Sequence, residues 1–236
     1  MATAVDLLAF GPHPDDLEIG LGGTLAKHAA LGHKVGLCDL TRGELASNGT
    51  PEGRLNEAED ARRVLGAVWR DNLGLPDRAI GSAPDHARRV AEVIRAARPR
   101  VIAVPYWHDR HPDHLSAFTL LRDGVFNAKL RKYEAAGEPW QAEWVCFYFI
   151  NDAASPSFVV DVSDYYEIKR KALACYRSQF IRATGAAETR LNSPAFNQLV
   201  ESRDAQFGAL AGVRFAEGIV TTEPVVRNGL LKTQEL

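Results

Sequence analysis

Two short segments, far apart in the chain, carry the side chains with the greatest capacity for chemistry. Residues 13–16 read His-Pro-Asp-Asp, and residues 108–114 read His-Asp-Arg-His-Pro-Asp-His. Two imidazoles and one carboxylate around an open coordination position form a common ligand set for catalytic zinc. Because nitrogen and oxygen donors without a thiolate also suit iron, cobalt or manganese, the metal stays open at this point. The two segments together predict a catalytic metal site.

The two carboxylates of the first segment are expected to have different roles. Pro14 has no N–H and pushes His13 into extended geometry, so a preceding strand must end there. His13 and Asp16, three residues apart, can converge on one ion, which leaves Asp15 aimed beside it. Two adjacent carboxylates repel one another unless a cation or a shared proton offsets the repulsion. A metal bound at this turn would provide that cation.

The second segment opens a helix. Pro112 suits the first helical position, so His111 and His114 would share one face at the helix N-terminus. A purely structural interpretation exists for each segment alone, since a histidine before proline is usually a loop residue and paired Asp residues often cap helices. Two such segments, each following an expected strand, favour function. The other histidines lack acidic partners at ligand spacing and are interpreted as exposed or packing residues: His28, His33, His86 and His108.

The elements that must position these segments alternate between two periodicities. Strands are expected at 4–10, 34–40 and 100–105, with a weaker one at 68–72, and helices at 19–31, 51–65 and 85–97. Further along, helices are expected at 115–133, 164–176 and 195–210, and strands at 144–150 and 158–162. This alternation predicts an α/β fold, with a Rossmann-like, mainly parallel sheet flanked by helices and a C-terminal elaboration. Ligands of such sheets bind beyond the carboxyl ends of the strands, where both segments lie.

Composition narrows the class of protein. A chain of 236 residues fits a single domain over 1–236, with a core of about 1–134 and a C-terminal cap of about 142–236. A net charge of -2 argues against a nucleic-acid partner. No apolar run is long enough to span a membrane, the N-terminus does not read as a signal peptide, and three scattered cysteines fit reduced thiols. A cytoplasmic location is therefore expected.

The motifs resemble those of the PIG-L/LmbE family of zinc-dependent N-deacetylases. Besides the two segments, the matching stretches are 41–44 (TRGE), 54–58 (RLNEA) and 72–77 (NLGLPD). Residues 176–180 (YRSQF) and 201–204 (ESRD) are similar to the bacillithiol-biosynthesis branch. The resemblance implies hydrolysis of the acetamide of N-acetylglucosaminyl-malate. It also implies one Zn²⁺ per chain, with Fe²⁺, Co²⁺ or Mn²⁺ as substitutes, and a homo-oligomer such as a hexamer.

The resemblance also implies residue roles. It makes His13, Asp16 and His114 the zinc ligands and Asp15 the general base. His111, as an imidazolium, would assist at the tetrahedral intermediate with Asp113 as its orienting partner, and Arg54 and Arg110 would line the substrate cleft. One position departs from the branch, because Phe196 stands where a tyrosine is common.

Other functions stay open. Zinc ligands alone do not distinguish glucosaminyl-malate from chitobiose, glucosaminyl-inositol or glycopeptide substrates, and a metal-dependent phosphoesterase could use the same ligands. A non-catalytic metal- or sugar-binding module would not require Asp15. A dinucleotide site is disfavoured, because the glycines within 20–23 come about ten residues after the first strand and miss the G-x-G-x-x-G spacing.

Overall fold

A seven-stranded sheet runs through the molecule, whose computed structural model describes residues 3–224. Its order is β3-β2-β1-β4-β5-β7-β6, and all pairings from β3 to β5 are parallel, whereas β7 is antiparallel to both neighbours. The strands are β1 (Leu7–Gly11), β2 (Val35–Thr41), β3 (Trp69–Leu75), β4 (Val101–Pro105), β5 (Trp144–Tyr148), β6 (Phe158–Asp161) and β7 (Ala216–Val220). The expected mainly parallel α/β sheet is confirmed.

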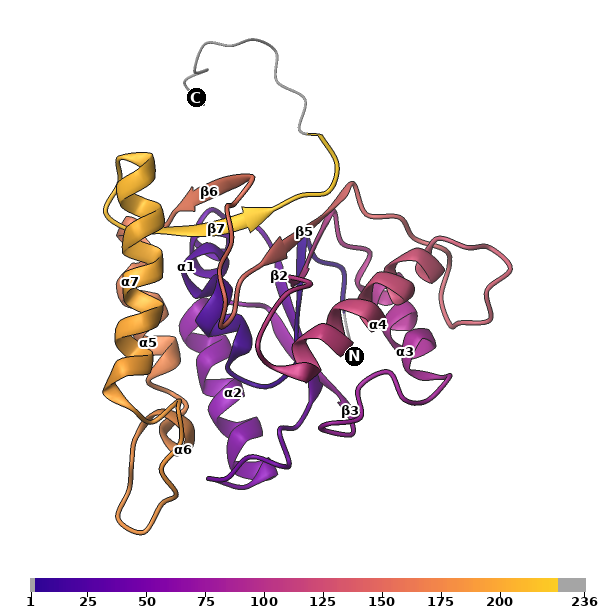
Figure 1. Ribbon diagram of the computed structural model, residues 1–236. Helices are drawn as coiled ribbons and strands as arrows, with labels where there is room; N and C mark the ends of the chain where they lie inside the picture. Colours follow the sequence, from indigo (N-terminus) through magenta and orange to yellow (C-terminus); the bar gives the residue numbers. More distant parts are fainter. Residues whose placement is uncertain (1–2, 225–236) are drawn as a thin grey trace.

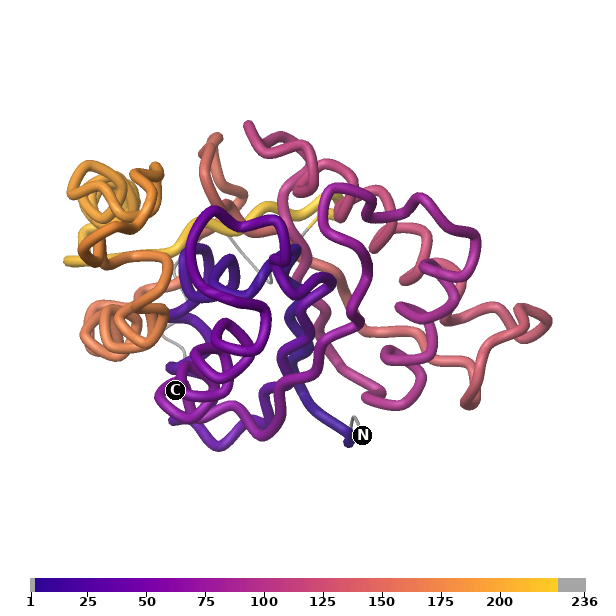
Figure 2. The backbone as a smooth tube through the Cα atoms, turned by 90° about the horizontal axis from the view of Figure 1, so that it is seen from below, coloured from indigo at the N-terminus to yellow at the C-terminus, as the bar shows by residue number. Residues whose placement is uncertain are grey.

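Helices cover both faces of the sheet (Figure 1). They are α1 (Asp16–Ala30), α2 (Pro51–Leu65), α3 (His86–Ala97), α4 (Pro112–Ala128), α5 (Tyr166–Leu173), α6 (Arg177–Phe180) and α7 (Pro194–Ala211), with a 3₁₀ turn at Ser163–Tyr165. The pair α3 and α4 packs on one face, while α1, α2 and α5 pack together on the other, and the strands run between these layers in Figure 2. Each face has its own apolar core, since strands such as β1 and β2 are buried on both sides.

The second half of the chain extends the sheet and adds α5 to one of its faces. Strands β5, β7 and β6 continue the same sheet beyond β4. Strand β7 and the short helix α6 were not expected, because the sequence of β7 (AEGIV) breaks its apolar run with an acid and a glycine. Within the described residues, no helix is long and apolar enough to cross a membrane.

Several helix boundaries differ from the expectations. Helix α2 spans 51–65 as expected, and α4 begins at Pro112, the position that suited a helix start, but α1 begins at Asp16 rather than 19 and α4 ends at Ala128 rather than 133. Strands β1 and β4 are parallel neighbours, with Leu7 opposite Val101. The loops that follow them therefore leave the same edge of the sheet, which brings the two segments together.

Candidate metal centre

The loop after β1 holds its carboxylates by a strained turn. Asp15 adopts a left-handed backbone conformation with φ 112°, which is costly for a residue with a side chain and is found mainly where surrounding structure enforces it. The His13 N–H donates to Asp16 Oδ2 at 2.9 Å, and the Thr41 N–H of β2 donates to the Pro12 carbonyl at 3.1 Å. Asp16 accepts from His13, whereas Asp15 accepts from Arg54, so the two carboxylates face different partners.

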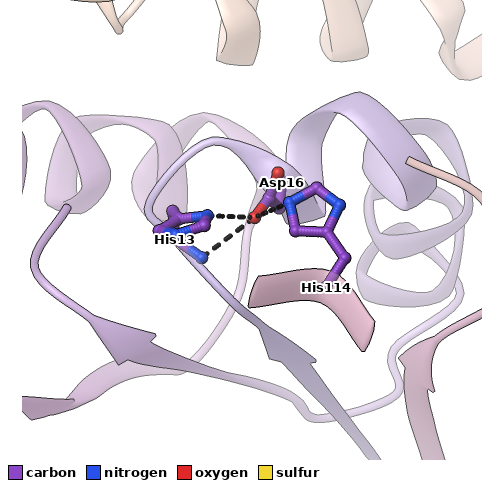
Figure 3. A group of neighbouring side chains, drawn as sticks. All are labelled: His13, Asp16 and His114. Carbon is purple, nitrogen blue, oxygen red and sulfur yellow. Dashed lines mark hydrogen bonds and ion pairs between the residues drawn. The ribbon is translucent and has the colours of Figure 1, made fainter. Parts of the chain in front are cut away.

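Three buried side chains meet at this edge of the sheet (Figure 3). Asp16 Oδ2 lies 3.1 Å from His13 Nδ1 and 3.3 Å from His114 Nε2. One donor atom from each residue lies within 4.8 Å of the other two. Two ring nitrogens and one carboxylate oxygen at this separation fit a divalent metal that keeps an open position. His13, Asp16 and His114 form one such group, and His13, His111 and Asp113 form a second, overlapping group.

The Asp109 carboxylate contacts the ring nitrogen of His114 that faces away from Asp16. Its Oδ1 lies 3.0 Å from His114 Nδ1, and it also accepts the backbone N–H groups of His111 at 2.8 Å and Asn151 at 2.9 Å. Such outer partners fix the tautomer and the ring orientation of a ligating histidine. Sequence reasoning missed both Asp109 and Asn151. An acid five residues before a ligand histidine was the available signal for the first, and nothing marked the second.

Asp113 does not orient His111 as expected. Its carboxylate accepts from the Arg78 backbone N–H and from Arg78 Nη1, both at 2.8 Å, and lies 3.4 Å from His13 Nε2. Only the Asp113 backbone N–H reaches His111, donating to Nδ1 at 3.2 Å. Asp77 lies 3.5 Å from the same His13 nitrogen. His111 caps the helix by accepting the backbone N–H of Asp113, and the Asp113 carboxylate lies near His13 instead.

Arg54 lines the cleft, but its guanidinium is already engaged. Nη2 donates to Asp15 Oδ2 at 3.0 Å and to the Pro14 carbonyl, while Nη1 donates to the Gly43 carbonyl at 3.3 Å. Both side chains of the Arg54–Asp15 pair are buried. Arg54 thus lies in the cleft lining, with its Nη1 and Nη2 bound to this turn and to Asp15, and its contact with substrate stays a prediction.

The charges of the metal-free site are strongly perturbed. Burial raises the pKa of Asp15 to about 7, against the opposing charge of Arg54. Burial also disfavours an ionised Asp16, yet the neighbouring His114 and His13 hold the pKa of Asp16 well below its usual range. Asp16 and Asp109 outweigh the burial of His114 and raise its pKa to about 9. Asp15 is therefore the carboxylate best suited to exchanging a proton near neutral pH.

His111 differs from the expected imidazolium. Burial and the nearby His114 and His13 lower the pKa of His111, which favours the neutral ring in the metal-free protein. Since Nδ1 accepts the Asp113 N–H, the neutral ring carries its proton on Nε2. His111 can therefore still donate a hydrogen bond to a developing negative charge.

His13, Asp15, Asp16, His111 and His114 line a cleft of about 510 Å³. Its walls include Arg78, Arg110 and Arg190, and residues from both halves of the chain contribute. Phe196 is buried in the wall with the Arg190 guanidinium 5.5 Å from its ring centroid. The position where a tyrosine was expected is thus an aromatic support within the cleft, without a hydroxyl.

Comparison with known proteins agrees with this geometry. A family model described as PIG-L, GlcNAc-PI de-N-acetylase, matches residues 8–124, which include both chemical segments. The diacetylchitobiose deacetylase of Thermococcus kodakarensis is 29% identical over 90% of this chain and 81% of its own length. A 1D-myo-inositol 2-acetamido-2-deoxy-alpha-D-glucopyranoside deacetylase of Saccharopolyspora erythraea is 29% identical over 71% of this chain and 81% of its own.

A solved structure extends the similarity over the whole chain. The conserved protein TT1542 from Thermus thermophilus is 39% identical, with a TM-score of 0.88, over 97% of this chain and 100% of that chain. The relatives support the deacetylase family but do not single out the bacillithiol branch. From the matched segments, the buried ligand group and these relatives, residues 8–124 of the chain are similar to the PIG-L family, and the curated relatives that the chain resembles are deacetylases.

Proposed function

We propose that this enzyme uses one Zn²⁺ to hydrolyse the N-acetyl group of N-acetylglucosaminyl-malate, as in bacillithiol biosynthesis. The relatives support the coarser statement that an acetylated amino sugar is the substrate. The observation that carries the chemistry is the buried group of His13, Asp16 and His114 directly beside the perturbed carboxylate of Asp15.

A metal held by His13, Asp16 and His114 would lower the pKa of a water molecule and polarise the acetamide carbonyl. Asp15 takes the proton as the water oxygen bonds to the carbonyl carbon, and returns a proton to the nitrogen as the carbon–nitrogen bond breaks. Arg54 binds only Oδ2 of Asp15, and no described residue hydrogen-bonds the other oxygen, which is therefore free to face the water. The products are acetate and a free amine.

His111 would stabilise the negative charge that develops on the carbonyl oxygen. As the carbonyl becomes tetrahedral, negative charge develops on its oxygen, and a hydrogen bond from the His111 Nε2–H would stabilise it. Removing one donor of this kind costs about 10²–10³ in kcat. Asp113 and Asp77 would keep His13 oriented through its Nε2 atom.

The cationic walls of the cleft support an anionic aglycone. Arg54 and Arg78 are paired with Asp15 and Asp113. Arg110 and Arg190 also line the cleft, and neither has a carboxylate partner among residues 3–224. A guanidinium binds a carboxylate through two parallel hydrogen bonds, and malate has two carboxylates. A neutral sugar or inositol aglycone would leave both cations without a counter-charge.

Acetate release from a panel of substrates tests the proposal. The zinc-loaded enzyme should show the highest kcat/KM with N-acetylglucosaminyl-malate, lower values with N-acetylglucosaminyl-inositol and diacetylchitobiose, and no hydrolysis of phosphoesters. Arg190→Ala and Arg110→Ala should each lower the kcat/KM for N-acetylglucosaminyl-malate by about 10–100-fold, which corresponds to the loss of a charge-assisted hydrogen bond. Neither variant should change the kcat/KM for diacetylchitobiose. Faster turnover of a neutral substrate would contradict the malate assignment. Phosphoester hydrolysis without any acetate would favour the phosphoesterase.

Metal content and assembly are tested on the same preparation. We propose one Zn²⁺ per chain and a homo-oligomer, so metal analysis should give one equivalent and light scattering a mass of several chains. Two equivalents, or a monomer, would contradict these assignments.

A further inference from the structure

Three charged side chains, those of Lys169, Asp204 and Glu217, are buried between α1, α5, α7 and β7, and the half-buried Arg203 lies beside them. Lys169 Nζ donates to Asp204 Oδ2 at 2.6 Å and to Glu217 Oε1 at 2.7 Å, and all three side chains are fully buried. Arg203 Nε donates to Asp204 Oδ1 at 3.0 Å. Two cations and two anions balance, which is the condition under which buried charges are tolerated. The deacetylase chemistry uses none of these four residues.

Arg203 also binds three backbone carbonyls from distant parts of the chain. Its Nη2 donates to the Ile19 carbonyl of α1 at 2.7 Å. Its Nη1 donates to the carbonyls of Ile150 at 2.7 Å and Phe149 at 3.2 Å, just after β5. A guanidinium has five N–H donors in a fixed plane, so it can bridge groups that an ammonium cannot. Arg203 therefore joins the start of α1 to the loop after β5.

The α1 side of this link lies within the helix Asp16–Ala30, whose backbone also binds side chains. The N–H groups of Gly23 and Thr24 donate to Glu217 at 3.0 and 2.7 Å, and the Ile19 carbonyl accepts from Arg203 at 2.7 Å. The glycines permit this approach, because a Cβ at Gly22 would lie 2.9 Å from Lys169 Cγ. This packing accounts for the glycines within 20–23 without a dinucleotide site.

Both ends of the link lead to the metal ligands. Ile19 lies three residues after Asp16 at the start of α1. Ile150 immediately precedes Asn151, whose backbone N–H and Nδ2 both bind Asp109, the partner of His114. We propose that Arg203 is a positioning residue for the metal centre: by bridging the carbonyls of Ile19 and Ile150, it sets the separation of Asp16 from His114. This inference rests on the metal centre proposed above.

The test is metal binding by Arg203→Lys. A lysine keeps the positive charge but cannot bridge the three carbonyls. We expect the Kd for Zn²⁺, measured by competition with a chelator, to rise about 10–100-fold, the range for lost support of a ligand. The absorption spectrum of the Co²⁺-loaded variant should also change, because it reports ligand geometry. The matched control is Val200→Ala on the same helix, which removes buried apolar contact without touching the charged group.

The possible outcomes separate positioning from stability. If Arg203→Lys lowers the melting temperature like Val200→Ala but keeps the wild-type Kd and Co²⁺ spectrum, the proposal is overturned. If Arg203→Lys does not fold, the charge-balanced double variant Arg203→Met with Asp204→Asn takes its place, with the same expected changes. If neither the single nor the double variant folds, the charged group of Lys169, Arg203, Asp204 and Glu217 serves the stability of the fold, and the proposal is overturned. Absence of metal binding by the wild-type protein would instead refute the metal centre itself.

Discussion

Replacing Asp109 by Asn isolates the contribution of an outer residue to the metal centre. The substitution keeps the shape of the side chain but removes the negative charge that lies 3.0 Å from His114 Nδ1. It also turns one acceptor oxygen into an N–H₂ group, which would face a backbone or side-chain donor of His111 or Asn151. We expect His114 to lose its fixed tautomer and orientation, and the metal to bind more weakly.

The structure sets the magnitude of this effect. Although burial opposes ionisation, the contacts from His114, His111 and Asn151 lower the pKa of Asp109 from 3.8 to about 2. A shift of this size corresponds to roughly 2 kcal/mol in favour of the carboxylate. Loss of an outer partner of a ligating histidine costs about 10–100-fold in metal affinity, or roughly 1.4–2.7 kcal/mol. We therefore expect the Kd for Zn²⁺ to rise about 10–100-fold.

Chelator competition with Zn²⁺ measures the change directly. Asp123→Asn is the matched control, since it removes the same charge from an exposed position on α4, where Asp123 lies 3.6 Å from Arg122 and far along the helix from His114. Asp109→Asn should bind Zn²⁺ at least about tenfold more weakly than this control. Equal affinities for the two variants would show that Asp109 does not support His114, and the reasoning would fail.

Three further predictions follow from the site and the core. Asp15→Asn should keep its metal and lose about 10²–10⁴ in kcat, whereas His114→Ala should lose the metal. Metal analysis and acetate release measure these two effects. Full activity of Asp15→Asn would exclude Asp15 as the general base. In the metal-free protein, His114 has its pKa raised from 6.5 to about 9, so its contribution to stability is complete below pH 6.5 and is lost as the pH rises through about 9. Urea unfolding of the metal-free protein across this window should show a falling free energy of unfolding, and Zn²⁺ affinity should rise with pH because binding displaces the proton; a pH-independent affinity would contradict this. Gly20→Ala should destabilise the protein by about 1–3 kcal/mol, because the new Cβ would lie 2.6 Å from the Phe149 carbonyl oxygen. Gly53→Ala in α2 is the control and should not destabilise it. Equal melting temperatures for the two variants would contradict the close approach of Phe149 to Gly20.

Much of the site was predictable because it depends on local pattern and strand order. The prolines within 13–16 and 108–114 mark where strands end and helices begin, and parallel neighbouring strands bring those ends together. The fold class followed from the same alternation of strands and helices. The antiparallel strand β7 was missed because its Glu217 reads as a surface residue until Lys169 is placed beside it.

The sequence by itself determined which donor types could bind a metal, and it predicted that Asp15 and Asp16 would face different partners. Only the tertiary structure decided the partners of each group: Asp113 with His13, Arg54 with Asp15, and Asp109 with His114. The physical reason is that donor chemistry and local turns are properties of neighbouring residues. A hydrogen bond, in contrast, requires two atoms within about 3 Å, and that closeness arises only when distant elements pack.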